Sequence, residues 1–201
     1  MVSAARTAAK LMTAEEFARE STDDARRELW RGVVVEMSPT KPVHSRVGFR
    51  LQAMLSAFVM RTGIGEIWPP DSGFTIEVEP DTVVSPDLAF VPQEIADRYE
   101  EDGPSFAEYV PPLVVETKSL FDREKEIAAK LAMYLGAGVG EVWWVRPKQR
   151  TLTRHWPDRD PIVLGLGEMV ADVEALPGFE MAVDDIFPPK RPAAQLSASP
   201  E

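Results

Sequence analysis

Acidic side chains stand inside two stretches of the sequence that are otherwise apolar. Asp87 follows Pro86 in PDLAFV, and Glu116 lies two residues before Lys118 in LVVETKS. Side chains alternate across a β-strand, so Glu116 and Lys118 share one face of the strand that this segment predicts. Burial of a carboxylate and an ammonium among leucine and valine costs free energy. The pattern therefore indicates that these groups perform chemistry.

Two carboxylates that meet at neighbouring strand ends are suited to binding a metal. Asp87 and Glu116 would offer hard oxygen ligands to Mg²⁺ or Mn²⁺, which keeps several waters. Such a cation lowers the pKa of a bound water and polarises a phosphoryl oxygen, while a lysine orients the nucleophile or offsets negative charge. This set predicts phosphodiester hydrolysis. The alternative is a surface ion pair between Glu116 and Lys118, worth under about 1 kcal/mol.

The composition restricts the kind of metal and the compartment. The chain has no cysteine and only two histidines, which excludes thiolate sites and a zinc site built on several histidines. The absence of cysteine favours the reducing cytoplasm. Neither a long apolar run nor a secretory signal is present, so we expect no membrane association. The 201 residues suit one domain over 11–187, with a flexible start at 1–10 and a disordered tail at 188–201.

The charge is unevenly distributed along the chain. The net charge is −11, which argues against indiscriminate coating of nucleic acid. Residues 71–109 hold eleven acids and one arginine, whereas residues 37–65 and 146–156 each hold four lysines or arginines and no acid. The two basic segments could contact an anionic partner such as DNA. The alternative is that all three segments are ordinary solvated surface.

The apolar spacing predicts a mixed α/β (α+β) domain. Valine-rich strands flank a hairpin turn near residues 31–32, and the spacing over 43–60 is typical of an amphipathic helix. A second helix is expected over 123–135, capped by Asp122. Further strands are predicted, with an antiparallel group in the C-terminal part, over residues 73–79, 83–91, 113–119, 141–145, 151–156 and 162–170.

Four stretches of the sequence resemble the Uma2 family of restriction-endonuclease-like proteins. They are ELWRGVVVEMSPTKPVHS, VVSPDLAFV, PPLVVETKS and EKEIAAKLAMYLGAGVGEVWWVRP, and together they span roughly residues 12–156. The last stretch is the most specific, because it holds Lys130, Tyr134 and the tryptophan pair in the family's order. The resemblance implies a PD-(D/E)XK fold with a mixed β-sheet flanked by helices, and a metal-dependent nuclease site that acts on DNA.

The resemblance also assigns residues to that site. Asp87 matches the aspartate of the PD motif, and Glu116 matches the second acidic metal ligand. Both Lys118 and Lys130 are candidates for the catalytic lysine, because many family members keep only the lysine that matches Lys130. We favour Lys118 for direct chemistry, since it shares a face with Glu116, and Lys130 as support.

Two further residues match family positions next to the site. Glu28 resembles the glutamate that precedes the family's hairpin turn, and it shares a face with Trp30. His44 lies with Val47 and Leu51 on the inward face of the first long helix. A buried histidine is more often satisfied by a neighbouring hydrogen bond than catalytic. We therefore place Glu28 and His44 beside the site and assign them no catalytic role.

Three functions stay open from the sequence. The first is a metal-dependent DNA endonuclease, for which a homodimer is expected because cleavage of a duplex needs two sites or two visits by one site. The antiparallel strands after residue 140 could form its interface. The second is a catalytically inactive module with the nuclease fold that binds nucleic acid or a protein partner. The third is another metal-assisted phosphoryl hydrolase with a closed pocket for a small substrate.

Overall fold

The protein is described from a computed structural model that covers residues 11–20, 26–37, 41–99, 103–119 and 122–189. The predictions for residues 1–10 and 190–201 lie outside this part of the chain. The helices are α1 (Ala14–Arg19), α2 (Pro42–Thr62), α3 (Gln93–Ala96), α4 (Glu124–Gly136) and α5 (Val183–Ile186). The strands are β1 (Arg27–Trp30), β2 (Val33–Glu36), β3 (Gly65–Trp68), β4 (Phe74–Glu77), β5 (Thr82–Val84), β6 (Leu88–Pro92), β7 (Leu113–Thr117), β8 (Glu141–Arg146), β9 (Thr151–His155), β10 (Ile162–Leu164), β11 (Met169–Val170) and β12 (Met181–Ala182).

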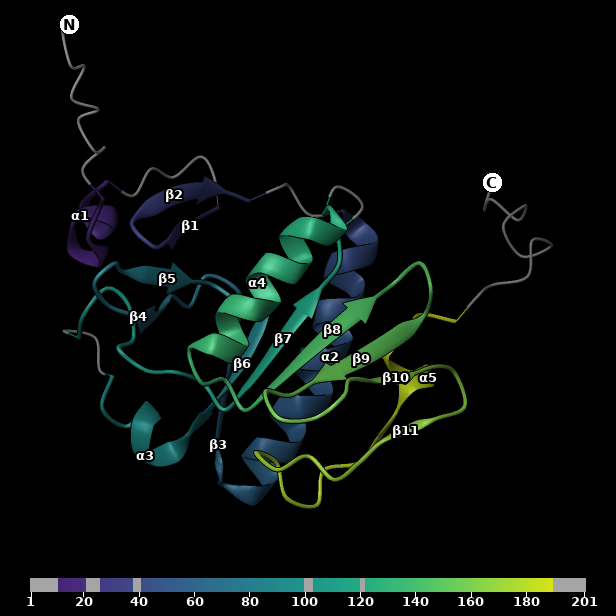
Figure 1. Ribbon diagram of the computed structural model, residues 1–201. Helices are drawn as coiled ribbons and strands as arrows, with labels where there is room; N and C mark the ends of the chain where they lie inside the picture. The colour runs from purple at the N-terminus through teal and green to yellow at the C-terminus, as the bar shows by residue number, and fades with distance from the viewer. Residues whose placement is uncertain (1–10, 21–25, 38–40, 100–102, 120–121, 190–201) are drawn as a thin grey trace, which may run out of the picture.

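A six-stranded mixed sheet forms the centre of the molecule. Its strand order is β10-β9-β8-β7-β6-β3. Strands β7 and β8 run parallel, and the other neighbours in this sheet run antiparallel. A parallel pair needs a crossover connection, which here is α4. Helix α4 crosses the front of the sheet in Figure 1 and α2 lies behind it, so both faces are covered. The predicted mixed sheet flanked by helices is confirmed.

Each long helix presents an apolar face to the sheet. In α2, Val47, Leu51 and Leu55 are fully buried at helical spacing and pack in one core cluster with sheet residues. Gly63, with φ at 68°, ends this helix in the left-handed conformation that favours glycine. In α4, Ile127 and Tyr134 pack in the core cluster on the opposite face of the sheet. Both faces of the sheet are therefore dry, and a polar side chain there needs a partner.

A smaller sheet, in the order β2-β1-β5-β4, lies beside one end of the main sheet (Figure 1). The hairpin turn predicted at residues 31–32 is confirmed, with φ at 49° and 77° for Arg31 and Gly32. The single strand predicted over 83–91 is wrong. The chain leaves the small sheet after β5 and enters the main sheet at β6, because Pro86 between them lacks the N–H that a continued ladder requires. This crossover brings Asp87 to the junction of the two sheets.

The start of α4 also differs from the prediction. Asp122 does not cap the helix; Arg123 is the N-cap residue, and the Asp122 carboxylate accepts a hydrogen bond from the Ser119 amide at 2.7 Å. The carboxylate thus closes the turn that leads out of β7 and does not reach the first turn of α4. The helix therefore begins one residue later than its sequence suggests.

The C-terminal part extends the sheet with antiparallel strands, as predicted. Strands β8, β9 and β10 pair in succession, although the single strand predicted over 162–170 divides into β10 and β11. Val170, Leu176 and Ile186 then pack on the α2 side of the core. None of the helices in the described ranges has the length and apolar character that crossing a bilayer requires.

Candidate active site

Asp87 and Glu116 lie at adjacent strand ends of the main sheet. Strands β6 and β7 are antiparallel with Leu88 opposite Val115, so the register continued by one residue sets Asp87 opposite Glu116. Asp87 Oδ2 also accepts a hydrogen bond from the amide of Thr117, the residue after Glu116, at 2.7 Å. The side chains of Asp87 and Glu116 are 7% and 9% exposed. Two acids that are distant in sequence are thus buried close together.

The Glu116 carboxylate is held by two side chains of α4. Lys130 Nζ lies 2.8 Å from Glu116 Oε1, and the Tyr134 hydroxyl donates a hydrogen bond to the same oxygen at 2.6 Å. Lys130 and Tyr134 are four residues apart, which puts them on one face of the helix. That face points at the sheet, where β7 presents Glu116. The other oxygen, Oε2, has no hydrogen-bond partner among the described residues.

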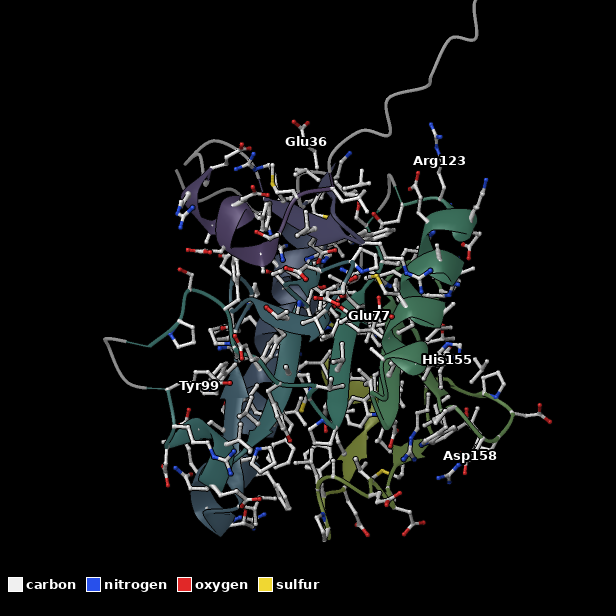
Figure 2. The ribbon with its side chains drawn as sticks, turned by 60° about the vertical axis from the view of Figure 1, so that its left-hand side comes forward. Glu36, Glu77, Tyr99, Arg123, His155 and Asp158 are labelled. Atoms are coloured by element: carbon white, nitrogen blue, oxygen red, sulfur yellow. The ribbon has the colours of Figure 1, made fainter. Side chains whose placement is uncertain are left out.

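Glu28 joins this group from the small sheet. Lys130 Nζ is 2.9 Å from Glu28 Oε1, so one buried ammonium bridges the carboxylates of Glu28 and Glu116. Glu28, at 1% exposure, also accepts hydrogen bonds from Trp30 Nε1 at 2.8 Å and from the Ser85 amide at 3.0 Å. Glu28 and Trp30 share a face of the hairpin, as predicted, whereas Glu36 of β2 is exposed and points away from the body of the protein (Figure 2).

Asp87 is held from the α2 side. His44 Nε2 lies 3.0 Å from Asp87 Oδ2, and Arg26 Nη1 lies 3.7 Å from Asp87 Oδ1. Burial favours a raised Asp87 pKa, but the hydrogen bond and charge of His44 and the Thr117 amide hold the pKa below its ordinary value. Burial lowers the pKa of His44, yet the hydrogen bond and charge of Asp87 raise it above 6.5 overall. The pair therefore favours an ionised carboxylate.

Glu116 differs electrostatically from Asp87. Burial raises its pKa to about 7; Lys130 opposes this rise, and the neighbouring carboxylates of Asp87 and Glu28 add to it. Burial lowers the pKa of Lys130, but Glu116 and Glu28 outweigh burial and raise it above its ordinary value. Burial is also the main reason that the pKa of Tyr134 is raised. At neutral pH the lysine is charged, and the tyrosine is a neutral donor.

Lys118 does not contact this group. Its ammonium lies 3.0 Å from Glu124 Oε1 and donates a hydrogen bond to the Asp122 carbonyl oxygen at 2.8 Å. The same glutamate pairs with Arg146, and this pairing with Arg146 and Lys118 lowers the pKa of Glu124 to about 2. Strand β7 ends at Thr117, so Lys118 follows the turn toward the start of α4. Of the two candidate lysines, the structure sets Lys130 against Glu116.

Two cavities flank the acidic pair. One, of about 290 Å³, is lined in part by Arg26, His44 and Asp87. The other, of about 230 Å³, is lined in part by Glu116 and Lys130. Asp87 therefore borders a cavity that residues of α2 also line, and Glu116 borders one that residues of α4 also line.

Carboxylate oxygens are the ligands that a hard divalent cation prefers, and Asp87 and Glu116 would supply two such groups. In the described part of the chain no three histidine or acidic side chains are grouped to hold a metal ion. Mg²⁺ nevertheless binds through one or two carboxylates and keeps several waters. Among the described residues, Asp87 Oδ1 forms an ion pair with Arg26 at 3.7 Å and accepts no hydrogen bond, and Glu116 Oε2 accepts none from them either. One oxygen of each acid is thus available, and a cation would offset the charge repulsion that raises the Glu116 pKa.

Sequence reasoning missed two residues of this group. Tyr134 lies one helical turn after Lys130, so the spacing could have placed its hydroxyl beside the same partner. Arg26 stands two residues before Glu28, and alternation along the strand would have put both on one face of the hairpin. Neither spacing identifies a site residue by itself, because the acids that Tyr134 and Arg26 contact lie in segments distant in the sequence.

The mixed sheet flanked by helices is a fold that a solved structure shares. A crystal structure described as that of a putative nuclease belonging to DUF820, from Anabaena variabilis, superimposes with a TM-score of 0.76. The sequences are 16% identical, and the match covers 87% of this chain and 97% of that one. At this identity the likeness shows the fold.

The family model for Uma2, described as "Putative restriction endonuclease", matches residues 14–184. The chain belongs to the Uma2 family, as the sequence resemblance predicted. No curated protein matches it.

Proposed function

We propose that this protein is a metal-dependent endonuclease that hydrolyses phosphodiester bonds of DNA. The observation that carries the proposal is the buried pair of carboxylates, Asp87 and Glu116, with the Lys130 ammonium 2.8 Å from Glu116. The family to which the chain belongs and the nuclease-type fold support the same reaction class. We assign the catalytic lysine to Lys130 and no longer to Lys118, whose charge is paired with Glu124.

Asp87 and Glu116 would hold Mg²⁺ or Mn²⁺. When bound, the cation would supply an acidified water and polarise a phosphoryl oxygen. His44 and the Thr117 amide fix one oxygen of Asp87 and leave the other available. Tyr134 and Lys130 fix Glu116 Oε1 and leave Oε2 available.

Two cationic side chains can act on the phosphate itself. Lys130 stays protonated in its dry position, so its charge can offset negative charge that develops at the reacting group. Arg26 is about one-third exposed beside Asp87, where its guanidinium can bind and orient a phosphate oxygen. Because both groups are held by carboxylates before substrate binds, they need little reorganisation during the reaction.

Cleavage of a supercoiled plasmid tests this function. With Mg²⁺ or Mn²⁺ the wild-type protein should nick or linearise the plasmid, and EDTA should stop it. Asp87→Asn and Glu116→Gln should each lower the rate by at least about 100-fold. Asp158→Asn is the matched control, because this exposed acid lies on the loop after β9, away from the site (Figure 2). Equal cleavage by Asp87→Asn and wild type would contradict the proposal.

The second candidate is a module that kept the fold and acts by binding nucleic acid or a protein partner. It is favoured by one observation, namely that Lys130 is already satisfied by two carboxylates without a cation. Such a module would bind its partner equally well after Asp87→Asn and would cleave nothing with any divalent metal. The plasmid assay, combined with a DNA-binding measurement on the same variant, separates the two functions.

A homodimer is part of the proposal, because two sites could cut both strands of a duplex in one encounter, whereas a single site needs two visits. The edge strand β10 supports it, since Ile162 and Val163 are 48% and 60% exposed there. Antiparallel pairing of two identical edge strands is compatible with twofold symmetry. Light scattering should give twice the chain mass for the wild type and the monomer mass for Val163→Lys. A wild-type monomer at micromolar concentration would contradict this part.

A further inference from the structure

The cavity beside Asp87 is bordered by one face of α2. Ser45, Gly48, Phe49 and Gln52 line it at helical spacing, opposite the segment that holds Asp71. Its volume of about 290 Å³ is near the lower limit for small-ligand sites, about 300 Å³. It has room for one planar group and none for a duplex. The proposed metal ligand Asp87 forms part of the cavity wall, so the cavity reaches the proposed metal site.

Phe49 is an unusual wall residue. The residue is 72% exposed, although the other phenylalanines of α2 and the main sheet are buried. An exposed aromatic ring costs free energy in water and offers a flat stacking surface. Gln52, one turn further along, is partly exposed and makes no hydrogen bond to a described residue, so its amide can both donate and accept.

Gly48 has no structural reason to be glycine. It lies in the interior of α2, and a Cβ added there would meet nothing within 4 Å. Its backbone is helical, so no left-handed conformation requires glycine. Glycine inside a helix is less stable than alanine by about 0.5–1 kcal/mol. Because Gly48 has no side chain, the space beside Phe49 in the cavity stays open.

The charge of α2 suits an anionic partner. In a chain of net charge −11, residues 42–62 contain three arginines and no acid. Arg46 is exposed and forms no ion pair with a described residue, and it lies one turn from Phe49 on the same stretch of helix. A phosphate backbone that follows α2 would therefore meet cations beside an exposed ring. This combination is how proteins bind unpaired nucleotides.

We propose that this cavity receives one unpaired nucleobase of the DNA substrate, stacked on Phe49 and contacted by Gln52. The inference rests on the proposed nuclease function and adds its substrate class: DNA with an unpaired nucleotide next to the scissile phosphate, in a single strand or at a defect in a duplex. Arg46 holds the backbone, and Gly48 keeps the cavity open. A fully paired base could not enter, because its partner strand would have to follow.

Binding of labelled DNA oligonucleotides tests the proposal. Fluorescence anisotropy in EDTA compares a single strand with the fully paired duplex of the same sequence. The wild type should bind the single strand more tightly. Phe49→Ala should weaken that binding by about 10-fold, the effect of one lost stacking contact, and leave duplex binding unchanged. Gly48→Leu should act in the same way, because its side chain would fill the cavity.

One variant serves as the control. Ala57→Leu adds the same side chain as Gly48→Leu at an exposed position of α2 outside this cavity, and should bind as the wild type does. Wild-type single-strand affinity in both Phe49→Ala and Gly48→Leu would overturn the proposal. So would an equal loss toward single strand and duplex.

The outcomes also separate this inference from the proposed function. If the wild type cleaves DNA through Asp87 but prefers a fully paired duplex, only the base-binding cavity is refuted. If it binds single strands through Phe49 but cleaves nothing with Mg²⁺ or Mn²⁺, the nuclease function is refuted and the cavity stands as a binding site. Binding to neither form of DNA would overturn both.

Discussion

Replacement of Lys130 by methionine tests the charge arrangement of the site directly. The ammonium is buried and lies 2.8 Å from Glu116 and 2.9 Å from Glu28, so its removal leaves two carboxylates without their shared counter-charge. Removal of one partner from a buried ion pair costs about 3–5 kcal/mol. The free energy of unfolding of a domain is about 5–15 kcal/mol, so the variant should be close to its limit of stability.

Urea unfolding at pH 7.5 followed by circular dichroism measures this cost through the shift in midpoint. Lys118→Met is the matched control, because it removes the same charge from a partly exposed pair with Glu124. Adding Glu28→Gln to Lys130→Met should recover part of the loss, since one uncompensated charge disappears. The reasoning would be refuted if Lys130→Met lowered the free energy of unfolding no more than Lys118→Met does.

Three further predictions concern the buried polar groups. Without divalent metal, the free energy of unfolding should fall as the pH rises from 5 to 8, because the Glu116 pKa is about 7 in the folded protein and about 4.5 in the unfolded chain. Glu116→Gln should flatten the dependence of the urea midpoint on pH. An unchanged slope in this variant would contradict the assignment to Glu116. Tyr134→Phe removes one donor to a charged oxygen and should cost about 1.5–3 kcal/mol in the same assay, with no loss expected if the hydroxyl were merely solvated. Arg154→Met should lower the melting temperature more than Arg159→Met, which changes an exposed arginine. The reason is that the buried Glu141 would keep its charge without its main partner. Equal melting temperatures of the two variants would contradict this prediction.

Much of the fold was predictable because its signals are local. The apolar spacing of Val47, Leu51 and Leu55 fixes the buried face of α2, and the same face carries His44 inward. The hairpin turn follows from Arg31-Gly32 between the strand segment that ends at Trp30 and the valine-rich segment that begins at Val33. The proximity of Asp87 and Glu116 also follows from the sequence once their two segments are adjacent strands, since both acids then fall near the same sheet edge.

The rest depended on contacts between distant segments. Alternation along β7 does not decide which lysine contacts Glu116. Partners outside the strand decide it: Lys118 pairs with Glu124, whereas Lys130 also pairs with Glu28 of the small sheet. The break at Pro86 is similar. Its apolar neighbours suggest one strand, and only the positions of the two sheets decide where the chain crosses between them.

The central claim is that Asp87 and Glu116 jointly bind a divalent cation. Anomalous diffraction from crystals soaked in Mn²⁺ tests it most directly, because the signal locates the ion without reference to activity. We predict one peak within coordination distance of oxygens from both carboxylates, and its loss in Asp87→Asn crystals. A map with no peak between these two side chains, or with manganese bound by other residues, would contradict the account.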